Sequence, residues 1–203
     1  MNDLLKQIIA FSVSIIVAAA IYFGAYLPLR KSQMHIDAIL NLQNGKVHSV
    51  GDLNDLFDPV LDFYSPIGQD EITSYYLGIL INIINQQTDR TVIDVLAKQA
   101  ENRMAPILQV EKGFSFNQNL YTLGSIYKIA AIKFKDKVYY DKAVNIFQEG
   151  LEYSPKRLIF LKGLFDLYSV NLDDQSKARE VGEIILKNWP DDKSTRDLID
   201  KIK

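Results

Sequence analysis

The sequence predicts an all-α protein in which an N-terminal transmembrane helix precedes an α-solenoid of antiparallel helix pairs. Residues 7–29 carry no charge, and the apolar residues after them recur at the three- and four-residue spacing of amphipathic helices. Ala143 and Pro155 recur as Ala178 and Pro190, in both cases 35 residues later. A fixed period of this length is typical of stacked helix pairs.

The length of 203 residues, with 48% hydrophobic and 24% charged side chains, fits one globular domain and an additional segment. We divide the chain into three predicted parts. They are a transmembrane anchor at 1–31, juxtamembrane helices at 32–68, and helical repeats with a C-terminal capping helix at 69–203.

The apolar run at 7–29 is predicted to cross a membrane. At about 1.5 Å per helical residue, its 23 residues can span a hydrocarbon layer of about 30 Å. Tyr22 and Tyr26 suit the headgroup zone near the C-terminal end of the run, and we expect Arg30 and Lys31 to close it in the interface. The sequence therefore predicts a single-pass membrane protein.

A cleaved signal peptide is the alternative interpretation of this run. The small residues Ala18–Ala20 would permit cleavage and give a mature N-terminus near Ile21. An anchor is favoured because the positive charge at the start is confined to Lys6 and the α-amine, and because the run continues past the cleavage point. The basic charges at the two ends of the run are nearly equal, so the sequence leaves open on which side of the membrane the rest of the chain lies.

Two helices, at 31–44 and 49–64, are predicted between the anchor and the repeats. The second begins at a capping box formed by Ser49 and Asp52. Pro59 is expected to kink this helix or to mark its true start. The residues expected to face a core are Leu53, Leu56, Phe57, Val60, Leu61 and Tyr64.

The repeat region begins with helices predicted at 70–84 and 91–105. Pro106 is expected to end the second of them, because the residue before a proline disfavours the helical conformation. Leu77 and Gly78 resemble the small-residue position at which two repeat helices approach closely. We interpret this pair as a diverged repeat.

A clearer unit follows between residues 117 and 155. Its first helix carries Leu120, Leu123, Gly124 and Tyr127, and its second carries Ala143, Phe147, Gly150 and Pro155. This set resembles the tetratricopeptide repeat, and the resemblance implies a TPR-like solenoid that holds a protein partner. We expect Gly124 and Ala143 to let the two helices cross at short distance, while Phe147 fills the seam between them.

The next unit matches the same pattern less fully. Its residues are Leu161, Leu164, Phe165, Tyr168, Ala178, Ile185 and Pro190. Phe165 stands where the first unit has Gly124, and Gly182 stands where an aromatic residue is usual. The mostly charged stretch 191–203 is typical of the polar capping helix that a terminal repeat needs.

The formal net charge of −2 lacks the basic surface that binding to nucleic acid requires. His35 and His48 lie in polar stretches without a recognisable nucleophile, and Asp58 with Asp62 lacks the glycine-centred loop of a calcium site. None of the 10 glycines forms a phosphate-binding loop. We therefore predict no catalytic residue, no cofactor, no metal ligand and no nucleic-acid partner, and a protein that is not an enzyme.

A candidate partner surface is predicted on the first helices of the two units. By helical spacing, a set of polar and aromatic residues should face away from the seams, toward the concave side of the solenoid. They are Tyr121, Ser125 and Lys128 in the first unit and Lys162, Asp166 and Ser169 in the second.

A second resemblance covers nearly the whole chain. It rests on Phe57, residues 62–68 (DFYSPIG), Glu71, residues 140–143 (YDKA) and residues 153–157 (YSPKR). These short motifs are similar to the helical-repeat tail of bacterial O-antigen ligase/polymerase-like membrane proteins. Such proteins have many membrane helices and a large external loop with the catalytic groups, which this chain lacks, so activity is not carried over.

The expected function is that of a membrane-anchored TPR-like scaffold or adaptor, without catalysis, in a bacterial envelope assembly. The alternative is a detached or accessory tail of an O-antigen ligase-like glycan-transfer system. In both cases the sequence predicts a protein partner and does not identify it.

Overall fold

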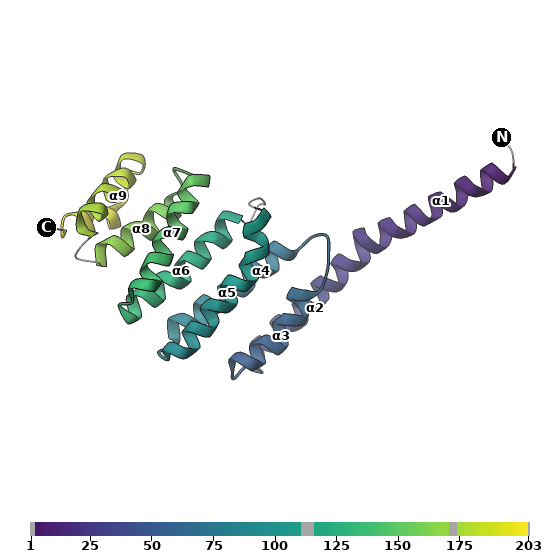
Figure 1. Cartoon of the computed structure of the whole chain (residues 1–203), viewed down its shortest axis with the longest axis horizontal. Coiled ribbons are helices and arrows are strands. Elements are labelled where there is room, and N and C mark those ends of the chain that lie inside the picture. Colours follow the sequence, from purple (N-terminus) through teal and green to yellow (C-terminus); the bar gives the residue numbers. More distant parts are fainter. Residues whose placement is uncertain (1–2, 111–115, 171–173, 203) are drawn as a thin grey trace. The chain divides into compact units, whose positions relative to one another are not determined.

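The computed structural model describes residues 3–110, 116–170 and 174–202. These residues are helical and contain no strand, which confirms the all-α class. The chain forms two compact units, Met1–Ile72 and Thr73–Lys203. Each unit is described by itself below, with the helix labels of Figure 1.

The first unit begins with one continuous helix. It consists of α1 (Asp3–Ile21), the π-helical turn η1 (Tyr22–Tyr26) and α2 (Leu27–Gln43), and together these make a helix of 41 residues. Among the described residues this helix alone is long and apolar enough to cross a membrane, and its most apolar stretch is fully exposed. A signal sequence near the N-terminus meets the same criteria of length and composition.

The segments predicted separately at 7–29 and 31–44 lie in one continuous helix, which ends at Gln43. Pro28 lies at the start of α2, directly after the π-turn. Proline has no N–H and its ring clashes with the carbonyl four residues earlier. The wider π-turn, which bonds residues five apart, lies where Pro28 would otherwise disturb the helix.

Helix α3 (Val50–Asp62) packs against α2. The predicted capping box is present, because Asp52 N donates to Ser49 Oγ at 3.1 Å and Ser49 N donates to Asp52 Oδ2 at 3.0 Å. Pro59 lies inside α3 and does not mark its start. Leu53, Phe57, Val60 and Leu61 are buried as expected and Leu56 is partly buried, but Tyr64 follows the helix and is exposed.

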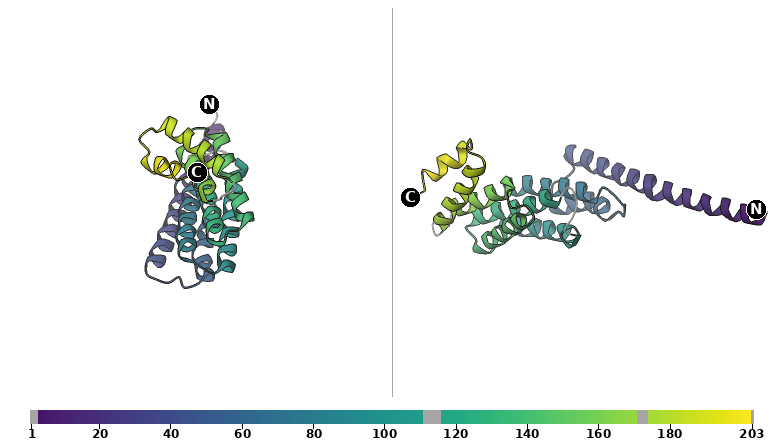
Figure 2. Two further views of the ribbon diagram at one scale, coloured as in Figure 1. Left: turned by 90° about the vertical axis from the view of Figure 1, so that its left-hand side faces the viewer. Right: turned by 90° about the horizontal axis from the view of Figure 1, so that it is seen from above.

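The remaining helices are consecutive hairpins. They are α4 (Gln69–Gln86), α5 (Arg90–Val110), α6 (Phe116–Phe134), α7 (Lys137–Tyr153), α8 (Leu158–Val170), α9 (Gln175–Asn188) and α10 (Lys193–Ile199). Helix α6 packs on α7 and α8 packs on α9, while α7 and α6 both contact α8 (Figures 1 and 2). Pro106 does not end α5, which continues through it to Val110. The short α10 packs on α9, at the position predicted for a capping helix.

Phe147 of α7 occupies the seam between α6 and α8. A Cβ added to Gly124 of α6 would lie 2.5 Å from one edge of the Phe147 ring, and a Cβ added to Gly163 of α8 would lie 2.7 Å from the other edge. Ala143 is fully buried on α7. Gly124 therefore has the role predicted for it, and Gly163 is a second close approach that the sequence interpretation missed.

The next seam has the same construction with the residue sizes exchanged. Here the large residue is Phe165 on the first helix, and the small one is Gly182 on the second. A Cβ at Gly182 would lie 2.9 Å from Phe165 and 2.5 Å from Ile199 of α10. The two departures from the repeat pattern therefore compensate each other in space.

The predicted close approach at Gly78 of α4 is wrong, because a Cβ added there would have no other atom within 4 Å. Helix α4 is held at its C-terminal end instead. Lys133 Nζ of α6 donates to the carbonyls of Ile84, Asn85 and Gln87 at 2.7, 2.8 and 2.6 Å. A cation there compensates the free carbonyls and the negative end of the helix dipole.

Candidate functional site

The six residues predicted to face a partner lie on α6 and α8, and most of them bind other residues of the chain. Lys128 Nζ on α6 forms an ion pair with Asp166 Oδ2 on α8 at 2.7 Å. The Lys128 side chain is only 16% exposed, whereas that of Asp166 is 44% exposed. This pair links two consecutive first helices and leaves Asp166 as its accessible member.

Lys162 binds the start of α10. Its Nζ lies 2.7 Å from Asp192 Oδ2 and donates to Ser194 Oγ at 2.7 Å and to Thr195 Oγ1 at 2.9 Å. Asp192 is also the N-cap of α10, since its Oδ1 accepts from Thr195 N at 3.0 Å. The hydrogen bonds from Lys162 and Thr195 hold the pKa of Asp192 below its usual range. Lys162 is thus committed to the fold and is not free for a partner, contrary to its predicted place on an open surface.

The other three residues are also turned inward or half-buried. Tyr121 packs against Phe147 and Phe160, with ring centroids 5.9 and 6.2 Å away. Ser125 is buried, and Ser169 donates to the carbonyl of Phe165 at 2.6 Å, one turn earlier. Of these three, Tyr121 contacts rings on two other helices, whereas Ser169 bonds within α8.

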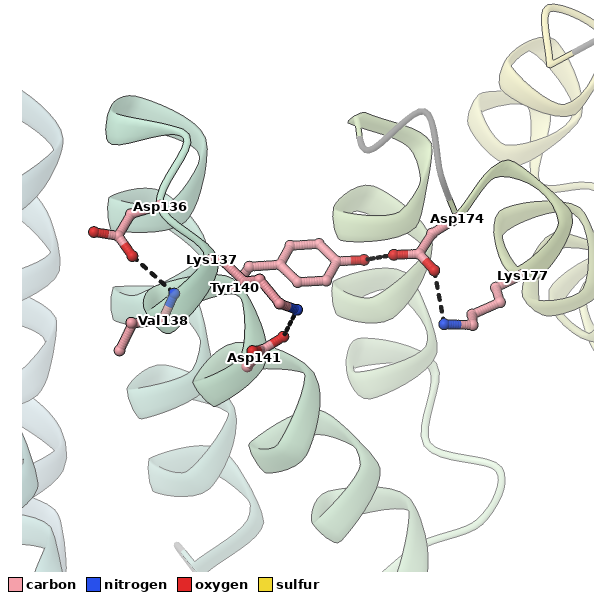
Figure 3. A network of polar contacts seen from close by, with 7 residues as sticks. All are labelled: Asp136, Lys137, Val138, Tyr140, Asp141, Asp174 and Lys177. Carbon is pink, nitrogen blue, oxygen red and sulfur yellow. Dashed lines mark hydrogen bonds and ion pairs between the residues drawn. The ribbon is translucent and has the colours of Figure 1, made fainter.

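A polar network on α7 and α9 was not identified from the sequence (Figure 3). Tyr140 OH of α7 donates to Asp174 Oδ2 at 2.5 Å, and Lys177 Nζ pairs with Asp174 Oδ1 at 2.7 Å. Asp174 is the N-cap residue of α9, but its carboxylate binds these side chains and not the helix N-terminus. From the sequence, Asp173 and Asp174 at this helix start are expected to stabilise the positive end of the helix dipole, and Asp173 lies outside the described residues.

A polar cleft with a volume of about 260 Å³ lies among α5, α6 and α7. Its lining includes three basic and three acidic residues, so the charge is balanced. The charged residues are Arg90, Lys98, Lys142, Asp94, Glu101 and Asp136, and Val138 at the start of α7 adds an apolar side chain that is 65% exposed. We call this group the α5–α7 cleft.

Glu101 is the centre of the cleft. Its Oε1 lies 2.7 Å from Lys142 Nζ and its Oε2 lies 3.1 Å from Lys98 Nζ. Burial alone would raise the pKa of Glu101, but the interactions with Lys142 and Lys98 outweigh it and lower the pKa to about 2. Burial, together with the nearby negative charge of Glu101, raises the pKa of Tyr127. Glu101 is therefore an anion and Tyr127 a neutral phenol at neutral pH.

Glu101 is already paired with two lysines, Lys98 and Lys142, so its carboxylate is poorly placed to act as a base. Within 3–110, 116–170 and 174–202, no group of three or more His, Cys, Asp or Glu side chains is placed to hold a metal ion. The exposed part of the cleft includes the ion-paired Arg90 and Lys98 and the apolar side chain of Val138.

Comparison with known proteins gives no match to a family model, to a curated protein or to a solved structure. The tetratricopeptide and O-antigen ligase resemblances therefore rest on the sequence motifs alone. The function proposed below is argued from the residues of this chain.

Proposed function

We propose that this protein is a membrane-anchored, non-catalytic helical-repeat adaptor, built in the manner of tetratricopeptide proteins, that binds a protein partner in a bacterial envelope assembly. The membrane part of the proposal rests on the helix Asp3–Gln43, whose apolar stretch is exposed along its length. An exposed apolar surface of this size is unfavourable in water and is satisfied by a lipid environment.

The observation that carries the adaptor proposal is the paired seam. Gly124 with Phe147, and Phe165 with Gly182, place one large and one small residue at matching positions of consecutive helix pairs. Contact between the first helices α6 and α8 accompanies this packing. Such repetition is typical of solenoids, which stack identical units and use their extended surfaces for binding.

The α5–α7 cleft is the partner surface that we favour, because the charged residues predicted on α6 and α8 (Lys128, Asp166 and Lys162) are paired with other residues of the chain. Around the cleft, Val138 and the ion-paired Arg90 and Lys98 are exposed. Charged groups at the rim of an interface steer association, and a central apolar residue contributes affinity.

The test is photo-crosslinking in cells with the full chain. A photoreactive phenylalanine derivative replaces Val138 in one variant and Asp166 in the other, so that each candidate surface carries one probe. We expect a discrete adduct from position 138. An adduct only from position 166 would move the partner to the α6–α8 face, and no adduct from either position would contradict the adaptor proposal.

Membrane attachment is tested separately by alkaline carbonate extraction and by the intact mass of the purified protein. We expect the protein to stay in the membrane fraction with its apolar helix intact. A mature N-terminus near Ile21 and release into the soluble fraction would instead establish the signal-peptide alternative.

A further inference from the structure

The connection between α3 and α4 carries exposed apolar side chains at the end of the membrane anchor. Tyr64 is 68% exposed and Ile67 is 64% exposed. Residues 63–69 contain no charged side chain, although an aspartate flanks the segment on each side. Single exposed apolar side chains are common on protein surfaces. Two of them in one uncharged loop form a small apolar patch.

The loop is fixed to the anchor helix by Lys31. Lys31 is 2% exposed, and its Nζ donates to the carbonyl of Phe63 at 2.8 Å and to Gln69 Oε1. Gln69 Nε2 in turn donates to the carbonyl of Leu61 at 3.2 Å. Both ends of the loop are therefore tied to one point on α2, and Lys31 is a buried structural residue rather than the interfacial cation predicted from the sequence.

The position of that point along the helix determines the depth of the loop. Lys31 lies two residues beyond Leu29, where the uncharged run ends, which is about 3 Å along the helix axis. Helices α2 and α3 form a hairpin whose turn lies at the end of α2 away from the anchor. Because α3 packs back along α2, its C-terminal end returns to the height of Lys31. If 7–29 spans the hydrocarbon layer, Tyr64 and Ile67 are held at the height of the lipid headgroups.

We propose that the loop at 63–69 is an interfacial membrane contact, in which Tyr64 and Ile67 enter the headgroup region beside the anchor. The proposal rests on the membrane-anchored function proposed above. Tyrosine is suited to this zone because its ring is apolar and its hydroxyl remains hydrated. Together with the exposed Arg30, the loop gives the anchor a second point of attachment and so fixes the orientation of the α2–α3 hairpin on the membrane.

Tryptophan fluorescence in vesicles tests the depth of the loop. The chain has one tryptophan, so Trp189→Phe provides a background without tryptophan. Three full-length variants then carry a single probe: Tyr64→Trp in the loop, Ile16→Trp within α1, and His48→Trp at the far end of the hairpin. His48 is exposed and lies beyond the end of α2, which is about 18 Å further along the helix than Lys31.

The variants are reconstituted in vesicles of phosphatidylcholine and phosphatidylglycerol whose lipids are brominated either near the headgroup or near the chain end. We expect the Tyr64→Trp emission to be blue-shifted and quenched by the shallow bromines, and Ile16→Trp to be quenched by the deep ones. His48→Trp is expected to show neither effect. Adding Ile67→Asp to the Tyr64→Trp variant should reduce the shallow quenching, because a charge is then placed beside the probe.

The outcomes separate the loop from the anchor. If Ile16→Trp is quenched and Tyr64→Trp behaves like His48→Trp, the loop contact is wrong while the anchor stands. If no variant is quenched, the membrane anchor is wrong and the loop contact with it. Equal shallow quenching of Tyr64→Trp and His48→Trp would also overturn the proposal, because the hairpin would then lie flat on the surface.

Discussion

Phe147 shows how closely single residues determine the packing of this protein. Its ring lies between Gly124 on one helix and Gly163 on another, and neither side has room for a methyl group. A side chain added on one side would push the ring toward the other, which is equally close. Overpacking of this kind costs about 1–3 kcal/mol because close-packed interiors relax only partly.

We therefore expect Gly124→Ala and Gly163→Ala each to lower the free energy of unfolding by about 1–3 kcal/mol. Gly78→Ala is the matched control, because it is also a glycine inside a helix but has open space around its Cα. The higher helix propensity of alanine should raise the free energy of unfolding of Gly78→Ala by up to about 1 kcal/mol. Thermal unfolding of the detergent-solubilised chain, followed by circular dichroism, measures the stability of the three variants. If Gly78→Ala lost as much stability as Gly124→Ala, the assigned seam would be contradicted.

Glu101 makes a prediction about pH. Its pKa in the folded protein is about 2, below the ordinary value of 4.5, so the folded state binds its proton less readily than the unfolded state. The stabilisation from this group is therefore complete above pH 4.5 and is lost as the pH falls toward about 2. Glu101→Gln removes the titration, and we expect the stability difference between wild type and variant to narrow over this pH range.

Urea unfolding at a series of pH values measures that difference. Asp141→Asn is the control, because Asp141 forms only an exposed ion pair with Lys137 and should change stability by at most about 1 kcal/mol. If the free energies of unfolding of wild type and Glu101→Gln differ by the same amount from neutral to acidic pH, the stabilisation by Glu101 does not depend on its charge.

At the scale of elements, Lys162 attaches the short helix α10 to α8. Its three partners, Asp192, Ser194 and Thr195, all lie at the N-terminal end of α10, a helix of only 7 residues. So short a helix is not stable by itself and depends on tertiary contacts. Ile199 of the same helix lies against Gly182 of α9, 2.5 Å from where a Cβ would be.

Lys162→Met keeps the length of the side chain and removes its charge and its donors. We expect a loss of about 1–3 kcal/mol, the range for hydrogen bonds to charged groups, and faster amide exchange in α10 and in the end of α9. Lys137→Met is the control, because its ion pair with Asp141 is exposed. Unchanged exchange in α10, measured by hydrogen–deuterium exchange and mass spectrometry, would be incompatible with this role of Lys162.

Periodicity in the sequence predicted the helices well but not all of their ends. Pro59 was predicted to kink its helix or to mark its start, and Pro106 to end its helix, yet both lie inside continuous helices, as does Pro28 near the start of α2. Whether a proline ends a helix depends on how neighbouring residues absorb the missing hydrogen bond, as the π-turn at Tyr22–Tyr26 does for Pro28. Such an adjustment is not visible in the spacing of apolar residues.

The candidate site could be predicted only in part for a related reason. Helical spacing placed Lys128 and Asp166 on the first helices of neighbouring units, but it does not reveal that these two opposite charges bind each other. The exchange of sizes between Phe165 and Gly182 was read as two defects, because the compensation exists only between helices. The Lys162 contacts depend on where α10 folds back, which no local pattern encodes.

For the whole molecule, the side of the membrane on which the repeats lie decides what they can bind. The basic residues near the two ends of the anchor, Lys6 on one side and Arg30 and Lys31 on the other, differ too little in number to determine that side. The envelope proposal requires the repeats outside the inner membrane. We therefore expect protease to digest a C-terminal tag in spheroplasts, whereas a cytoplasmic control protein stays protected. Digestion only after lysis would place the repeats in the cytoplasm, and the partner would then have to be sought there.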